Sequence, residues 1–105
     1  MSVQTIIERK LLDSFDPRHL EVVNESHRHN VPSGSETHFR VTICSVRFEN
    51  ENLVRRHRLV NDSLAQELAG PVHALAIHAL TPAEWLDREG RTAESPKCLG
   101  GSRAG

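Results

Sequence analysis

The chain has 105 residues, with 13 Lys and Arg against 14 Asp and Glu, 7 His, and a formal net charge of −1 when histidine is neutral. This length allows one domain with at most a tail, and the charge balance excludes a polybasic tail for nucleic acid or membranes. No apolar run approaches the roughly 20 residues of a membrane span, and the first residues lack the pattern of a secretory signal. We therefore expect a cytoplasmic protein with no membrane partner.

The first part of the chain predicts a helix, a strand and a long loop. Apolar residues recur at helical spacing over residues 3–15, and Pro17 ends this helix because it moves the preceding residue out of the helical region. Residues 19–25 follow as a strand. The polar segment 26–36 predicts a loop that is longer than a tight hairpin requires, and long ordered loops often carry function.

Residues 37–45 alternate cleanly between apolar and polar positions and predict a second strand. We expect its inward face to hold Phe39, Val41 and Ile43, and its outward face to hold His38, Arg40, Thr42 and Cys44. The other cysteine, Cys98, lies far along the chain and forms no CxxC motif with Cys44, so neither a zinc ribbon nor a thioredoxin-type motif is available.

The second part of the chain predicts a helix, a strand and a short final helix. Residues 53–68 show helical spacing and Gly70 marks the end of the helix. The expected buried stripe of this helix is Leu53, His57, Val60, Leu64 and Leu68. Residues 72–80 are nearly all apolar and predict a buried third strand. Thr81 can cap the last helix, with Glu84 three residues later as in a capping box.

The resulting order is α-β-β-α-β-α. It predicts an α+β fold in which the helices lie on one face of a three-stranded mixed sheet. We place this domain at residues 1–90 and expect a flexible tail over residues 91–105.

Two groups of histidines are candidate metal ligands. His27 and His29 are separated by one residue, so both project to one side if the loop is extended, and imidazole binds zinc, copper, iron and nickel. His73 and His78 fall in the third strand at an odd spacing, so they point to opposite faces and do not share a site. The alternatives are solvated loop histidines and a core histidine bonded to the backbone.

Arginines gather around the start of the helix at 53–68. Between positions 38 and 58 there are five Arg against two Glu. The members near this helix start are Arg47, Arg55, Arg56 and Arg58. A basic helix start can contact phosphates, and the alternative is a solvated charged face. No nucleophile–base pair is set by the sequence and no nucleotide motif occurs, so we do not expect an enzyme.

Three segments of the chain resemble the BolA family. They read SHRHNVPSGSETHF over residues 26–39, RHRLV over 56–60 and GPVHALAI over 70–77, and the segment SPKCLGG over 95–101 is also similar to the family's tail. The resemblance covers essentially the whole chain and is strongest to the bacterial subgroup linked to stress response and cell morphology. It implies a fold similar to a class II KH domain.

The resemblance implies a partnership with a monothiol glutaredoxin around a shared 2Fe–2S cluster, in iron–sulfur trafficking and in iron and stress signalling. By this resemblance the chain supplies His73 from the start of the third strand and His29 from the loop, with His27 as an auxiliary candidate. The glutaredoxin cysteine and a glutathione thiol complete the ligand set. We expect no cofactor in the free chain, which is a monomer or a weak homodimer.

The resemblance also implies a second role, direct binding of promoter DNA in the transcriptional control of stress response and cell morphology, with no obligatory cluster. This role maps onto Arg55, Arg56 and Arg58, with Arg47 on the approach to them. Family members often carry glycine after the second strand, whereas residues 48–52 of this chain include two glutamates, which repel phosphate.

Overall fold

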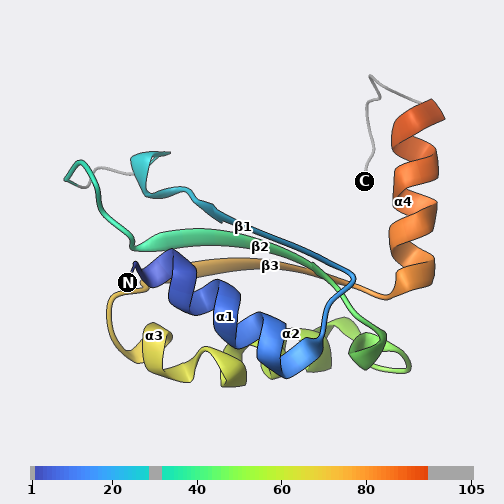
Figure 1. The fold of residues 1–105 in the computed structure, drawn as a ribbon, viewed down its shortest axis with the longest axis horizontal. Coiled ribbons are helices and arrows are strands. Elements are labelled where there is room, and N and C mark those ends of the chain that lie inside the picture. Colours follow the sequence, from blue (N-terminus) through green and yellow to red (C-terminus); the bar gives the residue numbers. More distant parts are fainter. Residues whose placement is uncertain (1, 29–31, 95–105) are drawn as a thin grey trace.

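The computed structural model describes residues 2–28 and 32–94. In chain order its elements are α1 (Val3–Phe15), β1 (His19–Asn24), η1 (Ser26–Arg28), β2 (His38–Cys44), η2 (Val46–Phe48), α2 (Leu53–Ser63), α3 (Ala65–Ala69), β3 (Ala74–Leu80) and α4 (Pro82–Glu94), where η marks a short 3-10 helix (Figure 1). The predicted α+β order is confirmed, with the second helix divided in two.

The sheet has the strand order β1-β2-β3, with β2 in the centre. β1 runs antiparallel to β2 and pairs Asn24 with Phe39, whereas β3 runs parallel to β2 and pairs Ala74 with His38. The predicted mixed sheet is therefore confirmed. We call the end of the sheet at which β2 and β3 begin the loop end, and the opposite end, where β3 leads into α4, the α4 end.

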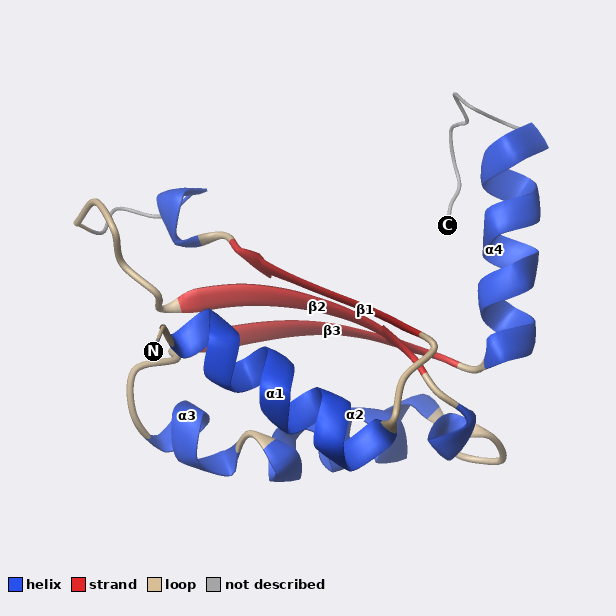
Figure 2. Ribbon diagram, viewed as in Figure 1, coloured by secondary structure: helices blue, strands red, loops and turns tan. Residues whose placement is uncertain are grey.

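Helices α1, α2 and α3 cover one face of the sheet, and the core lies between these two layers (Figure 2). The buried apolar side chains are Ile7, Leu11, Phe15, Val22, Phe39, Val41, Ile43, Phe48, Val60, Leu64, Val72 and Ala79. α4 differs from the expectation, because it extends from the α4 end away from the other helices (Figure 1). Among the described helices, none has the length and apolar character needed to cross a bilayer.

α1 follows directly from its sequence. The side chain of Ser2 accepts a hydrogen bond from the backbone N–H of Thr5 at 3.1 Å and caps the helix. Ile7, Leu11 and Phe15 repeat every four residues and are the buried face. The chain leaves the helix at Asp16, whose φ of 43° lies in the left-handed region.

The predicted helix over 53–68 breaks at Leu64. This residue stays in the core, and the segment after it turns so that Glu67 is buried beside α1, where its carboxylate lies 2.9 Å from the ammonium of Lys10. The predicted buried stripe is wrong at Leu53, which is 64% exposed, because Arg56 takes the buried position on that turn.

Two expectations about the strands are also wrong. Thr42 and Cys44 were expected to face solvent, but each is buried. β2 is the central strand, so both residues have a neighbouring strand on each side. Near Cys44, its pairing partner His19 is in addition stacked on Trp85 of α4. The third strand was expected to be buried, but β3 is an edge strand whose His78 is exposed on the face without helices.

The last helix is longer than predicted. It reaches Glu94, so residues 91–94 are helical rather than part of a tail. The remainder of the predicted tail, residues 95–105, lies outside the described residues.

Candidate functional site

The loop end of the sheet brings three chain segments together. Because Asn24 pairs with Phe39 and His38 pairs with Ala74, the end of β1, the start of β2 and the start of β3 meet there. The long loop between β1 and β2 therefore leaves the sheet beside the residue that precedes β3, which is His73. Segments far apart in sequence are adjacent only because of this register.

A buried hydroxyl holds the two ends of this loop together. Ser26 is 3% exposed, and its oxygen accepts hydrogen bonds from the backbone N–H groups of Thr37 at 2.9 Å and His38 at 3.1 Å. Asn24 adds two bonds, because its carboxamide accepts from the N–H of Ser26 and donates to the carbonyl of Ser35, each at 2.9 Å. These contacts place the start of β2 without a tight turn.

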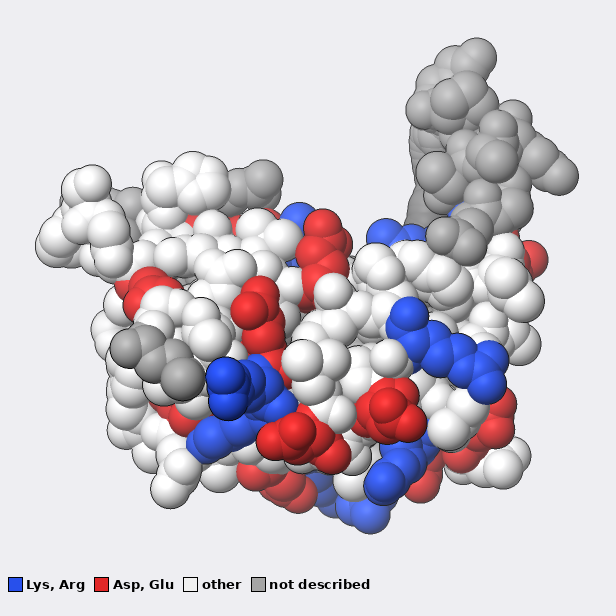
Figure 3. All heavy atoms as spheres, viewed as in Figure 1, with Lys and Arg blue, Asp and Glu red and all other residues white. Residues whose placement is uncertain are grey.

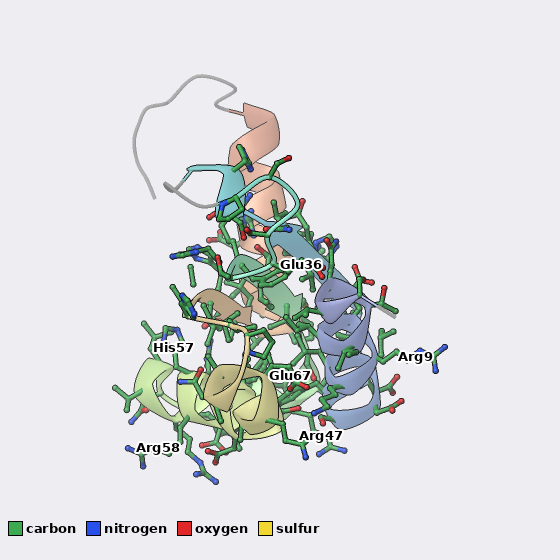
Figure 4. All side chains as sticks on the ribbon, turned by 90° about the vertical axis from the view of Figure 1, so that its left-hand side faces the viewer. Arg9, Glu36, Arg47, His57, Arg58 and Glu67 are labelled. Carbon is green, nitrogen blue, oxygen red and sulfur yellow. The ribbon has the colours of Figure 1, made fainter. Side chains whose placement is uncertain are left out.

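The far end of the loop is bound to α1. The carboxylate of Glu36 accepts hydrogen bonds from the backbone N–H groups of Val3 at 3.1 Å and Gln4 at 3.2 Å. Figure 4 shows Glu36 at the beginning of this helix. A negative charge is favourable there, because the first N–H groups of a helix have no partner within it and carry partial positive charge.

His73 is held by its backbone and presents its side chain to solvent. Its N–H donates to the carbonyl of Thr37 at 2.8 Å, and the preceding Val72 is buried with its N–H bonded to the carbonyl of Glu67 at 3.0 Å. The imidazole is exposed. The backbone position is thus fixed on both sides while the ring is accessible to a metal or a partner.

The structure brings His38, and not His78, next to His73. The ring centres of His38 and His73 are 6.2 Å apart and the rings meet edge to face. His78 lies further along β3, opposite Thr42. Sequence reasoning treated His38 as a surface or packing residue, and only the pairing of β2 with β3 could have revealed this neighbour.

The loop histidines are placed in part. His27 is exposed and lines an open cavity of about 420 Å³ together with Asn24, Ser26 and the segment 32–35. His29, the predicted loop ligand, lies outside the described residues. Within the described ranges, no group of three or more His, Cys, Asp or Glu side chains could hold a metal ion.

Arg56 is part of the fold rather than of the basic surface. Its guanidinium donates to the carbonyls of Glu51 at 2.8 Å and Ala79 at 3.0 Å, and to the carboxylate of Glu84 at 2.7 Å. It is 7% exposed, in contrast to the expectation that it contacts DNA. The spacing of four residues between Arg56, Val60 and Leu64 was the signal that placed it on the buried face.

Glu84 joins α4 to this arginine and to its own helix start. The hydrogen bond from Arg56, and then that from the backbone N–H of Thr81, hold the pKa of the Glu84 carboxyl below its ordinary value. The hydroxyl of Thr81 accepts from the N–H of Glu84 at 3.2 Å in return. The predicted capping box is confirmed, and it is joined to α2 through an ion pair.

The other arginines of the predicted basic cluster are exposed. Arg47 and Arg58 point outward from the layer of helices (Figure 4). Arg55 is also exposed, and its side chain lies 3.8 Å from the carboxylate of Glu51. Figure 3 shows acidic and basic side chains interspersed on one face of the molecule, rather than a field of one sign.

The connection between η2 and α2 turns without glycine. Asn50 adopts a φ of 67°, in the left-handed region that asparagine tolerates better than most residues. The following Asn52 caps α2, since its side chain accepts from the N–H of Arg55 at 2.8 Å. Asn50 and Asn52 therefore set where α2 begins, ahead of the exposed Arg55 and Arg58.

A family model described as BolA-like protein matches residues 11–84 of the chain. The chain belongs to the BolA family. The DNA-binding transcriptional regulator BolA of Vibrio cholerae is 56% identical over 101 residues, which are 96% of this chain and 95% of that protein. The resemblance drawn from the sequence is confirmed.

Solved structures of BolA proteins share the fold. The solution structure of BolA1 from Mus musculus has a TM-score of 0.77 and 52% identity, and the match covers 95% of this chain and 80% of that one. The BolA domain of SufE1 from Arabidopsis thaliana has a TM-score of 0.75 and 44% identity, with coverage of 80% and 96%. The region matched by the BolA model contains His38 and His73, together with the exposed Arg47, Arg55 and Arg58.

Proposed function

We propose that this BolA-family chain partners a monothiol glutaredoxin and holds a 2Fe–2S cluster at their interface, with His73 as a ligand. The observation that carries the proposal is the exposed imidazole of His73 at the loop end, on a backbone bonded to Thr37 at 2.8 Å. A solved relative is the BolA domain of SufE1 from Arabidopsis thaliana, so a BolA domain also occurs as part of another protein.

The residues of the loop end fit such a group. Imidazole replaces cysteine as a ligand in some 2Fe–2S centres, and the cluster then has a higher reduction potential. The hydrogen bonds of Ser26 and Glu36 fix where the loop leaves and rejoins the fold. His29 is the second ligand in this proposal, with His27 as its auxiliary, and the glutaredoxin cysteine and glutathione supply the thiolates.

The test mixes the full chain with a cluster-loaded monothiol glutaredoxin and glutathione and records visible absorption and circular dichroism. We expect His73→Ala to abolish the spectral change that wild type produces. His78→Ala is the matched control, because it removes another exposed imidazole from the same strand. Wild-type spectra from His73→Ala, or no complex with wild type, would contradict the proposal.

The second candidate function is direct DNA binding. It is favoured by the exposed Arg47, Arg55 and Arg58 around the start of α2, and by the name of the Vibrio cholerae relative, a DNA-binding transcriptional regulator. In this role the exposed arginines contact phosphates and orient the start of α2 on the duplex, while Arg56 stabilises the fold behind them.

Phosphate contacts make the affinity fall steeply with salt, since each neutralised phosphate releases counterions. We expect Arg58→Ala to weaken binding to duplex DNA and to reduce the slope of log affinity against log salt by about 1. Arg9→Ala on α1 is the control, because it removes the same charge from an exposed position on another helix. Equal effects of the two variants would exclude a contact specific to α2.

A further inference from the structure

We propose that His38 and His73 together bind one divalent first-row transition-metal ion, such as Zn²⁺, without any partner protein. This site goes beyond the proposed function, because it needs neither glutaredoxin nor cluster, although His73 belongs to both. It rests on three features of the described residues, which are the distance between the rings, the hydrogen bond that orients one of them, and the exposure of the other.

The distance between the two rings is close to that of a bound pair. Zinc–nitrogen bonds of about 2.0–2.1 Å in tetrahedral geometry place two imidazole ring centres on one ion about 5 Å apart. The ring centres of His38 and His73 are 6.2 Å apart. A small rotation of the exposed His73 side chain closes the difference, because its backbone is fixed by the bond to Thr37 and its ring is not buried.

The hydroxyl of Thr37 orients the ring of His38. It lies 2.8 Å from Nδ1 of His38 and 3.4 Å from the oxygen of Ser26. Metal binding through Nε2 requires the tautomer in which Nδ1 carries the ring proton and donates it to Thr37. The lone pair then lies on Nε2, and this arrangement, in which the second ring nitrogen donates to an oxygen, is typical of metal-binding histidines.

The pair provides two ligands, and water completes the coordination. Within the part of the chain that the structure describes, no third His, Cys, Asp or Glu joins these two rings in a metal-binding group. A site of two imidazoles and water is open, which makes it accessible to an incoming thiolate or imidazole. We expect a dissociation constant for Zn²⁺ in the micromolar range, and exchange of the ion with other chelators.

The test is isothermal titration of the full chain with Zn²⁺ alone, in a buffer that does not bind metals. We expect His38→Ala and His73→Ala each to weaken binding of one ion at least tenfold, while the control His78→Ala stays within twofold of wild type. Thr37→Val keeps the size of the side chain and removes the oxygen that orients His38, so we expect about tenfold weaker binding. Nitrogen-detected NMR of wild type should show the proton of His38 on Nδ1.

Two results would overturn the site. The first is wild-type affinity in His38→Ala, and the second is an equal loss in His78→Ala, which would indicate scattered binding to surface histidines. Circular dichroism melts of each variant show whether it is folded. A His38→Ala chain that still takes up cluster from glutaredoxin but no longer binds Zn²⁺ confirms this inference. A wild-type chain that takes up cluster but binds no Zn²⁺ contradicts the metal site and leaves the proposed function intact.

Discussion

The two ends of the sheet use the same residue types in opposite ways. At the α4 end, His19 stacks on Trp85 with ring centres 4.1 Å apart, and Arg56 is buried against two carbonyls and a carboxylate. At the loop end, His73 is exposed and its backbone, rather than its ring, makes the stabilising contact. The difference shows that residue type alone does not identify the histidines and arginines that stabilise the fold, whereas their side-chain contacts do.

Removing the buried arginine should have the largest effect on stability. In Arg56→Ala the carbonyls of Ala79 and Glu51 lose their donor, and each unpaired buried group has a cost. We expect the free energy of unfolding to fall by about 3 kcal/mol. Urea denaturation measures this, with the exposed Arg58→Ala within about 0.5 kcal/mol of wild type as the control. Equal losses in both variants would mean that Arg56 is not a structural residue.

At the loop end the largest effect should come from Ser26→Ala. The backbone N–H groups of Thr37 and His38 then lose their common acceptor. We expect a loss of about 1–2 kcal/mol, together with faster hydrogen exchange of these two amides. Ser33→Ala, at an exposed position of the same loop, is the control. Unchanged exchange in Ser26→Ala would show that the loop is held in another way.

Comparing His19→Ala with His73→Ala sharpens the contrast between the ends. A stacked aromatic pair contributes about 0.5–1.5 kcal/mol, so we expect His19→Ala to destabilise the fold by about 1 kcal/mol. His73→Ala should stay within about 0.5 kcal/mol of wild type, as for most surface substitutions. Thermal melts of both variants check this. A larger loss of stability in His73→Ala than in His19→Ala would mean that His73, and not His19, is the histidine that stabilises the fold.

The smallest effect concerns pH at the α4 end. Folding lowers the pKa of Glu84, so its stabilising contribution is complete above the ordinary glutamate pKa and disappears as pH falls through the folded value. The difference in unfolding free energy between wild type and Glu84→Gln should be below about 1 kcal/mol at neutral pH, since the side chain is 46% exposed. It should vanish in acid. A difference that grows in acid would contradict the ion pair.

Sequence alone was sufficient where the determining pattern was local. The α1 helix was predicted from the helical spacing of Val3, Ile6, Ile7, Leu11, Leu12 and Phe15. Of these, Ile7, Leu11 and Phe15 are buried, whereas Leu12 is 51% exposed. The alternation of β2 placed Phe39, Val41 and Ile43 on the inner face. The capping box of α4 was predicted because its two residues are three positions apart.

Sequence failed where the pattern depended on distant segments. Thr42 and Cys44 occupy the positions of β2 that the alternating pattern predicts to be exposed. They are buried because the burial of a central strand depends on the neighbouring strands and on α4. Arg56 is a different case, because a local signal was present: its spacing of four residues from the buried Val60 separates it from the exposed Arg58, although both were predicted to contact DNA. The approach of His38 to His73 depends on a parallel pairing that nothing near either residue encodes.

The contact between His38 and His73 depends on a pairing between distant segments. β1 and β2 are successive in the chain, whereas α2 and α3 lie between β2 and β3, so pairing position 38 with position 74 closes a longer loop and costs more chain entropy. An ion held by both rings would bind the native chain and not the unfolded one. At a free concentration one hundred times its dissociation constant, it would add about 2.7 kcal/mol to the stability by mass action. The free energy of unfolding of the protein would then depend on the concentration of free metal ion in the solution.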